Sequence, residues 1–299
     1  MRFPVNISSF SRAPRIIGLL AMALVLQSCS AIKIAYNQAP ELAYWYLDGY
    51  VDFNGNQMVQ VKDELARLQT WHRQSQLPIY VDTLQKLQQE VQSNITSERV
   101  CSIYSDVRRK LMAVTDRAEP AIASLATTLE TQQIAHIEKR FEKSNAEYRD
   151  DYIETSARAS RKKRYKQAVD RAEMAYGRLD DAQLAMIGRN IDQSYFDARL
   201  IYAERIRRQR DAIQSIKTLM AARQAGTQTA EKTMAAVRGV MDRSFNSPDA
   251  AYRSYQEKFT QDGCRDLAEF HNTTSAEQRA HAARTLARYE QDMKILTKG

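Results

Sequence analysis

The residue with the clearest chemistry in this sequence is Cys29, the first of three cysteines. Leu26, Gln27 and Ser28 precede it, so an aliphatic residue stands three positions before the thiol and a small one directly before it. At this pattern a bacterial signal is cut and the new N-terminal cysteine takes a diacylglycerol, although glutamine is a less usual middle residue. A second acylation at the freed amine gives the multi-chain anchor that one acyl chain cannot provide. The pattern predicts lipidation at Cys29; an ordinary signal with an incidental cysteine, or a buried N-terminal helix, is the alternative.

The residues before Cys29 have the composition of a secretory signal. Arg2, Arg12 and Arg15 supply positive charge without an acidic residue, and residues 16–26 form an unbroken apolar run. A run this short is typical of a signal and is too short to span a bilayer. We therefore expect a cleaved lipoprotein signal peptide over residues 1–28.

The rest of the chain is expected to form a short tether and one domain. The lipidated tether covers 29–40, and 41–299 is a single α-helical domain, since no stretch rich in glycine and serine separates two parts. Ser30 follows the cysteine, where an aspartate would retain a lipoprotein at the inner membrane. This favours the outer membrane of a bacterial cell envelope, with the domain facing the periplasm. The first expected partner is therefore the membrane, and no nucleic acid is expected.

The two remaining cysteines, Cys101 and Cys264, are predicted to form a disulfide. A cysteine pair in an oxidising periplasm is usually bonded. This bond would join the first third of the chain to the last, and the chain-entropy estimate for such a closure is about 4–5 kcal/mol. Two buried free thiols are the alternative. A metal site would need closely spaced cysteines or nearby histidines, so neither a metal nor a cofactor is expected.

Two clusters of basic residues form the candidate binding surface. One lies in the segment SARASRKKRYK and the other in AERIRRQRD. In a periplasmic protein such groups would meet phospholipid headgroups, lipopolysaccharide phosphates or an acidic face of an envelope protein. A solvated helix face is the alternative for each cluster. The candidate residues for an anionic partner are Arg158, Arg161, Lys162, Lys163, Arg164 and Lys166 in the first cluster, and Arg205, Arg207, Arg208 and Arg210 in the second.

Residues that could catalyse a reaction are present but scattered. The four histidines form no short metal-binding pair, and no nucleophile elbow, phosphate-binding loop or dinucleotide fingerprint occurs. Asp48 and Asp52 lie four positions apart on one helical face, a spacing that can serve acid–base work, but no nucleophile motif accompanies them. An enzyme would have to gather groups such as these with His72 or His271 in one pocket. We expect no enzyme and name no catalytic residue.

The composition predicts an all-α fold. Nine glycines and six prolines are too few for many hairpins, and 43% hydrophobic with 27% charged residues is typical of a folded body. Apolar residues recur every three to four positions, which gives a multi-helix bundle of about eight to ten helices. Two long antiparallel helices, over about 131–179 and 184–224, are expected to meet at a tight connection. A capping box of Asp180 and Gln183 is expected to start the second.

Prolines and aromatic residues add two local expectations. Pro78 is expected to end a helix, and Pro120 to kink or restart another. Four aromatic residues crowd into 44–50, close to the expected anchor. Such rings can sit at a bilayer interface, but we prefer the simpler interpretation that they fill the core of the helical body.

Several short motifs are weak one at a time and distinctive together. They are Leu26 to Cys29, Tyr36-Asn37, Tyr44 to Asp52, Trp71-His72-Arg73, Leu77 to Tyr80, Val100-Cys101, and a C-terminal set that runs from His271-Asn272-Thr273-Thr274 through Gln278-Arg279, Leu286 and Tyr289-Glu290 to Asp292. In this combination the chain resembles a family of proteobacterial lipoproteins catalogued only as a domain of unknown function. The resemblance covers nearly the whole mature chain. It implies a helical lipoprotein but no activity, so it transfers no functional residue.

A fainter similarity is to periplasmic stress chaperones with Leu-Thr-x-x-Gln repeats. Short segments similar to this repeat occur at 95–99, 179–183 and 274–278, and each departs from it in at least one residue. A capping box produces the same letters for structural reasons, which is the interpretation we prefer. The sequence therefore predicts a lipid-anchored, periplasm-facing protein that acts by binding, in envelope interaction or scaffolding. A holdase-like chaperone is the alternative, and an enzyme with scattered catalytic residues is the second alternative.

Overall fold

A computed structural model describes residues 31–298, so the predicted signal peptide and Cys29 lie outside the described residues. All regular elements within them are helical, and the predicted all-α multi-helix fold is confirmed. In the part of the chain described, no helix has the length and apolar character needed to cross a membrane. The elements are α2 (Ala31–Asn37), α3 (Ala39–Val51), α4 (Gly55–Trp71), the π-helical segment η1 (His72–Gln76), α5 (Leu77–Glu90), α6 (Ser97–Ala126), α7 (Thr131–Tyr152), α8 (Ala157–Tyr176), α9 (Asp181–Gln193), α10 (Ala198–Gln224), α11 (Ala230–Phe245), α12 (Ala250–Asn272) and α13 (Ala276–Leu296).

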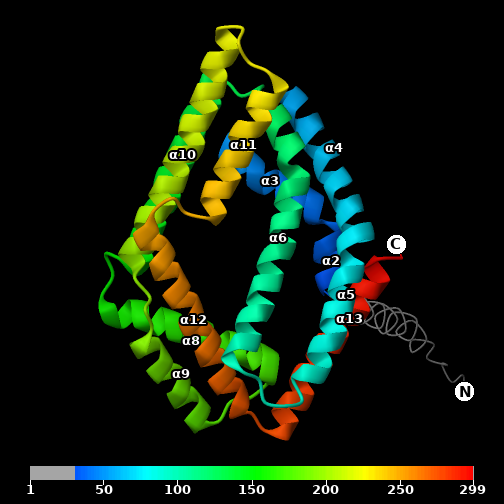
Figure 1. Cartoon of the computed structure of the whole chain (residues 1–299), viewed down its shortest axis with the longest axis vertical. Helices are drawn as coiled ribbons and strands as arrows, with labels where there is room; N and C mark the ends of the chain where they lie inside the picture. The colour runs from blue at the N-terminus through cyan, green and yellow to red at the C-terminus, as the bar shows by residue number, and fades with distance from the viewer. Residues whose placement is uncertain (1–30, 299) are drawn as a thin grey trace, which may run out of the picture.

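The last third of the chain packs back onto the first third. Helix α13 lies along α5, and α12 lies along α6, while α11 packs between α6 and α10 (Figure 1). Helix α7 packs on α10, and α8 packs on α9. The buried side chains form separate clusters at these contacts, such as Ile134 and Ile137 of α7 with Ile213 and Met220 of α10. The fold is thus an extended frame of paired helices with several small cores.

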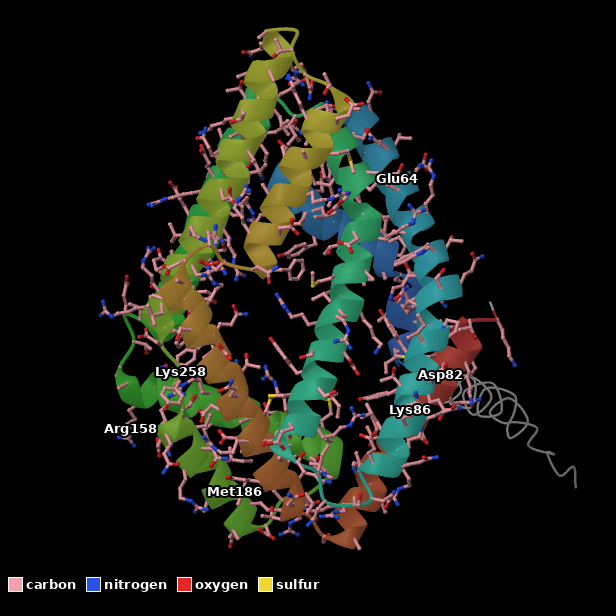
Figure 2. The ribbon with its side chains drawn as sticks, in the orientation of Figure 1. Glu64, Asp82, Lys86, Arg158, Met186 and Lys258 are labelled. Carbon is pink, nitrogen blue, oxygen red and sulfur yellow. A yellow bond between two sulfur atoms is a disulfide. The ribbon has the colours of Figure 1, made fainter. Side chains whose placement is uncertain are left out.

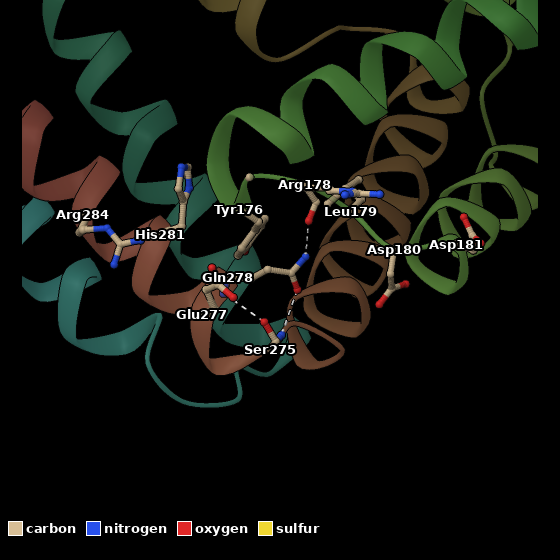
Figure 3. A pocket seen from close by; sticks show the side chains of 11 residues that line it. Tyr176, Arg178, Leu179, Asp180, Asp181, Ser275, Glu277, Gln278, His281 and Arg284 are labelled. Atoms are coloured by element: carbon tan, nitrogen blue, oxygen red, sulfur yellow. Dashed lines mark hydrogen bonds between the residues drawn. The ribbon is translucent and has the colours of Figure 1, made fainter.

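Side-chain caps define where several helices begin. Thr96 accepts a hydrogen bond from the backbone N–H of Arg99 at the start of α6. The predicted capping box of Asp180 with Gln183 starts α9, and Ser275 forms another with Gln278 at the start of α13 (Figure 3). Each box satisfies backbone donors that a helix end leaves free. The letters that resemble chaperone repeats therefore have a structural role at these two helix starts.

Each of the two long helices predicted from the sequence is divided in two. The first breaks between α7 and α8, where Ser156 accepts from the N–H of Ala159. The second breaks between α9 and α10, where Asp197 accepts from the N–H groups of Arg199 and Leu200. The side-chain oxygens of these caps accept hydrogen bonds from backbone N–H groups that a continuous helix would pair with carbonyls. The chain can therefore turn here without a proline or glycine. The expected antiparallel pairing remains, as α8 with α9 and α7 with α10.

Proline does not interrupt the helices where the sequence predicted it would. Helix α4 continues through η1 into α5, with Pro78 in the first turn of α5. In η1 the N–H of Leu77 donates to the carbonyl of His72, five residues back. This wider turn re-registers the hydrogen bonds just before the residue that lacks an N–H, so the helix passes the proline. Helix α6 also continues through Pro120, so the chain does not restart there; the predicted kink at this proline stays a prediction.

The aromatic segment near the N-terminus is only partly in the core. Tyr44 is buried and stacks on Phe53, with ring centroids 6.1 Å apart. Trp45 and Tyr46 are exposed. The prediction that these aromatic side chains fill the core is therefore wrong for two of them, because the helix presents consecutive residues to different sides.

The predicted pairing of Cys101 with Cys264 is present in the structure. The two sulfur atoms are 2.06 Å apart and the Cα atoms 5.4 Å apart, across 163 residues of sequence. The bond connects the start of α6 to α12 and lies among Val100 and Ala268, which are both buried. It therefore fastens the contact between α6 and α12, one of those through which the last third of the chain reaches the first.

Removing this bond should destabilise the fold. We expect the double variant Cys101→Ala/Cys264→Ala to lose about 2–5 kcal/mol of unfolding free energy, because its unfolded chain is no longer cross-linked. Denaturant titration of both proteins measures the loss, and reduced wild-type protein should match the variant. Two alkylatable thiols found by intact-mass analysis of the unreduced protein would contradict the bond.

The contact between α5 and α13 contains a carboxylate that bonds both helices. Glu290 of α13 accepts from the side-chain amides of Gln85 and Gln88 of α5, at 2.8 and 2.5 Å, and pairs with Lys294 on its own helix at 2.5 Å. Hydrogen bonds from Lys294, Gln88 and Gln85 lower the pKa of Glu290 to about 2. The folded state therefore prefers the ionised carboxylate more strongly than the unfolded state does.

This preference predicts an acid sensitivity. A group whose pKa is lowered on folding stabilises the fold above its unfolded pKa, and this contribution is lost as the pH falls from about 4.5 toward 2. Between pH 6 and pH 3, wild-type protein should lose more unfolding free energy than Glu290→Gln in denaturant titrations. Asp82→Asn, which alters an exposed carboxylate of α5 (Figure 2), should behave as wild type. Equal pH slopes for wild type and Glu290→Gln would contradict the assignment.

Candidate functional site

The first basic cluster, on α8, is largely engaged within the protein. Arg161 forms a bidentate pair with Asp192 of α9, at 2.5 and 2.7 Å. Lys163 pairs with Asp151 at 2.5 Å, and Lys166 with Asp170 at 2.6 Å. These basic side chains thus fasten α8 to its neighbours or to itself.

Arg164 is the most enclosed residue of this cluster. Its guanidinium lies 4.7 Å from the ring centre of Phe196 and donates to the carbonyl of Ile191 at 3.3 Å. Burial lowers the pKa of Arg164. Arg158 and Lys162 are exposed, and neither has a hydrogen bond, ion pair or ring contact within residues 31–298; Arg158 lies at the outer edge of the molecule (Figure 2). The first cluster therefore offers a partner two separate cations rather than a continuous basic surface.

The second basic cluster, on α10, is organised around a buried carboxylate. Glu204 accepts from Arg207 through both oxygens at 2.8 Å, from Arg208 at 2.8 Å, and from the hydroxyl of Ser247 at 3.0 Å. Burial alone would raise the pKa of Glu204, but these hydrogen bonds outweigh it and hold the pKa below its usual value. Glu204 thus fixes the orientation of two arginines and joins α10 to the loop before α12.

Two adjoining hollows border this part of α10. The polar hollow, about 970 Å³, lies between α7 and α10 and is lined by charged side chains of both signs. The tyrosine hollow, about 490 Å³, lies among α3, α7, α10 and α12. Phe141 and Gln209 line both. Arg207, Arg210, Lys217 and Arg243 bring the positive charge to the polar hollow, and Glu138, Glu142 and Asp211 the negative.

In the tyrosine hollow, arginines lie against aromatic rings. The guanidinium of Arg205 lies 6.0 Å from the ring centre of Tyr148, and that of Arg208 lies 5.9 Å from Tyr252. Arg205 also donates to Asn145 at 2.7 Å. Burial raises the pKa of Tyr148 to about 12, so its hydroxyl stays neutral. A planar guanidinium on a ring binds carboxylates or phosphates while the ring offers an apolar face.

The sequence prediction located the arginines of this site but not its aromatic side. Tyr148 and Tyr252 are more than a hundred residues apart, and only the fold brings them to one hollow. The sequence analysis also does not predict the exposure of Tyr46, because it places the aromatic residues at 44–50 in the core. Arg210 is exposed at the polar hollow and has no ion pair or hydrogen bond inside the described part of the chain.

The four groups considered for catalysis are not gathered in one place. Asp48 accepts from the N–H of Phe53 at 3.0 Å, and Asp52 has a left-handed backbone at the end of α3. His72 bonds the hydroxyl of Tyr36 at 2.9 Å, and burial lowers the pKa of this histidine. His271, on α12, bonds Ser93 and Tyr176 instead of any of these three residues. Across residues 31–298 no group of three or more histidine, cysteine, aspartate or glutamate side chains is placed to hold a metal.

His271 belongs to a structural clamp. Its Nε2 is 2.9 Å from the carbonyl of Ser93 and its Nδ1 is 2.9 Å from the hydroxyl of Tyr176. A carbonyl can only accept, so Nε2 carries the proton and Nδ1 accepts from the tyrosine. Burial lowers the pKa of His271, which favours this neutral form. Both ring nitrogens are therefore occupied by the fold.

A third hollow, of about 610 Å³, lies where the starts of α9 and α13 meet (Figure 3). The side chains of Gln183 and Gln278 bond each other there at 2.8 Å, and Gln278 donates to the carbonyl of Arg178 at 2.9 Å. Charged side chains of both signs also line it, among them Arg178, Asp181, Glu277 and Arg284. None of the residues of the two basic clusters lines this hollow.

Comparison with known proteins identifies the family. Residues 49–234 match the family of unknown function DUF6279. The chain belongs to this family. The match covers more than half of the chain, from the end of α3 into α11, and includes both basic clusters and the α10 side of both hollows. No curated protein and no solved structure matches the chain.

Glu204 should be needed for the order of this site. In Glu204→Gln, Arg207 and Arg208 lose their shared anion, and we expect a loss of about 2–4 kcal/mol in unfolding free energy because the carboxylate is buried. Glu142→Gln, at an exposed glutamate of the polar hollow, should stay within about 0.5 kcal/mol of wild type. Denaturant titration measures both. A Glu204→Gln protein as stable as wild type would show that the α10 arginines do not depend on this carboxylate.

Proposed function

We propose that this protein is a lipid-anchored, periplasm-facing member of the bacterial envelope that acts by binding a protein partner along α10. The observation that carries the proposal is the pair of adjoining hollows. Arginines lie over tyrosines in one, and at the other Arg210 has no hydrogen bond or ion pair to any residue of 31–298. Arginine and tyrosine are the residues that most often anchor protein interfaces.

The chemistry of the hollows suggests the kind of segment that would bind. The tyrosine hollow suits an apolar or aromatic side chain next to a carboxylate, since Arg205 and Arg208 stand against aromatic faces. The polar hollow has charges of both signs. A protein segment with mixed charge fits this better than a uniformly anionic lipid surface, which would meet Glu138 and Glu142.

The lipid anchor in this proposal rests on the sequence around Cys29. The apolar run, the small residue before the cysteine and the serine after it support an outer-membrane address. Helix α2 begins at Ala31, so most of the segment expected to be the lipidated tether is helical. The proposed anchor would therefore be joined to the folded body by very few residues.

The α10 surface should be the one that meets the partner. With a photoreactive amino acid in place of Gln214, which is exposed and lines the polar hollow, in-cell cross-linking and mass spectrometry should give one dominant protein adduct. Arg210→Glu should reduce this adduct about tenfold, since a reversed charge at an interface costs on the order of 1.4 kcal/mol or more. Lys162→Glu, an equally exposed reversal on α8, is the matched control and should leave it unchanged.

The other outcomes separate the alternatives. A broad set of unfolded envelope proteins in the adducts would favour the holdase-like chaperone. A lipid adduct would favour an anionic lipid as the partner. Loss of the adduct in Lys162→Glu with Arg210→Glu unaffected would move the binding surface to the first basic cluster.

A further inference from the structure

The outward face of α2 and α3 is rich in large apolar side chains. Ile34, Leu42, Trp45 and Tyr46 are 53%, 50%, 61% and 67% exposed. At 100° per residue they fall within about 120° of one helical face. One charged side chain, that of Glu41, lies beside this stripe: it is 40% exposed and pairs with Lys62 of α4 at 3.1 Å.

This face is a rigid part of the molecular surface. The N–H groups of Gln38 and Leu42 donate four residues back, to Ile34 and Gln38, so helical hydrogen bonding continues from α2 into α3. On the other side Tyr36 bonds His72 at 2.9 Å, and Asn37 accepts from Arg73 at 2.9 Å. The inner side of α2 is thus fastened to the body, and the apolar stripe is held pointing away from it.

We propose that this face of α2 and α3 lies in the interface of the phospholipid bilayer that holds the N-terminal lipid. The inference rests on the proposed anchor at Cys29, which stands two residues before the start of α2. At 1.5 Å per residue, Ile34 is about 5 Å and Tyr46 about 23 Å along the helix from its start at Ala31. A lipidated chain therefore brings the stripe to the membrane surface.

The residue types of the stripe fit this occupant. Tryptophan and tyrosine are favoured at the level of lipid headgroups, where a ring has an apolar body and a polar edge. An amphipathic helix can lie in the plane of the interface with its apolar side toward the acyl chains. Since the residues of the stripe are uncharged and the neighbouring Glu41 is paired with Lys62, docking should depend on apolar contact and should be insensitive to salt and to anionic lipid.

Trp45 provides the measurement. Full-length, lipidated protein is reconstituted in phosphatidylcholine vesicles, with and without phosphatidylglycerol, and tryptophan fluorescence is recorded with brominated phosphatidylcholine as quencher. Wild-type emission should shift to the blue and be quenched in both lipid compositions. Trp45→Phe, which retains Trp71 as its only tryptophan, should lose most of the quenching. Because Trp45 is exposed, this variant should fold as wild type does.

Failure of the inference and failure of the anchor give different results. Protein that carries lipid by intact mass and floats with the vesicles, but whose Trp45 is quenched by iodide and not by brominated lipid, would overturn the docking of α2 and α3 and leave the anchor standing. Protein whose mass shows no lipid and which does not float would overturn the anchor, and the inference with it.

Discussion

The structure depends on the contact between the last third of the chain and the loop that joins α5 to α6. Asn272 bonds both the N–H and the carbonyl of Ile95, at 2.9 and 3.0 Å, and Arg279 donates to Asn94 at 2.6 Å. With His271 on Ser93, three side chains from the end of α12 and the start of α13 bind one loop. The disulfide lies next to this contact at the start of α6. Because the cores between helix pairs are small, closing the frame here holds the pairs together.

The same contact explains the polar residues between His271 and Arg279. The segment from His271 to Arg279 contains a histidine, an amide and an arginine, which taken alone could suggest catalysis or anion binding. In the fold their polar atoms are directed at backbone and side-chain groups of residues 92–95. The loop between α5 and α6 has backbone donors and acceptors that no helix satisfies, and these polar side chains bind several of them. Such a pattern records the fold rather than an activity.

Local signals predicted the helices better than their ends. Caps depend on neighbours within three residues, so Thr96, Asp180 and Ser275 could be identified from the sequence. The breaks after α7 and α9 could not be identified from the sequence. An isolated serine or aspartate such as Ser156 or Asp197 occurs on the exposed face of a helix as well as at a cap. The prediction that Pro78 ends a helix was wrong for a different reason. The π-helical turn that accommodates it is a property of the hydrogen-bond register over five residues and has no signature in the residue types.

The charged residues show a further limit of sequence reasoning. The six basic residues of α8 look like a binding surface when counted along the chain, but Asp192 and Asp151, which neutralise Arg161 and Lys163, come from other helices. On α10 the acid is nearer, at Glu204, and only the structure shows that this carboxylate is buried and orders the arginines. What a partner can use is the charge that remains after such pairing.

The two proposed surfaces are connected, which constrains where a partner can approach. Tyr46 belongs both to the apolar stripe of α2 and α3 and to the wall of the tyrosine hollow. The rigid attachment of α2 through Tyr36 and His72 leaves little freedom for the body to turn relative to this face. If the face lies in the bilayer interface, the tyrosine hollow must open beside the headgroups and not toward the distant periplasm. A segment that reaches it would then come from a protein at the same membrane, close to where its chain leaves the lipid.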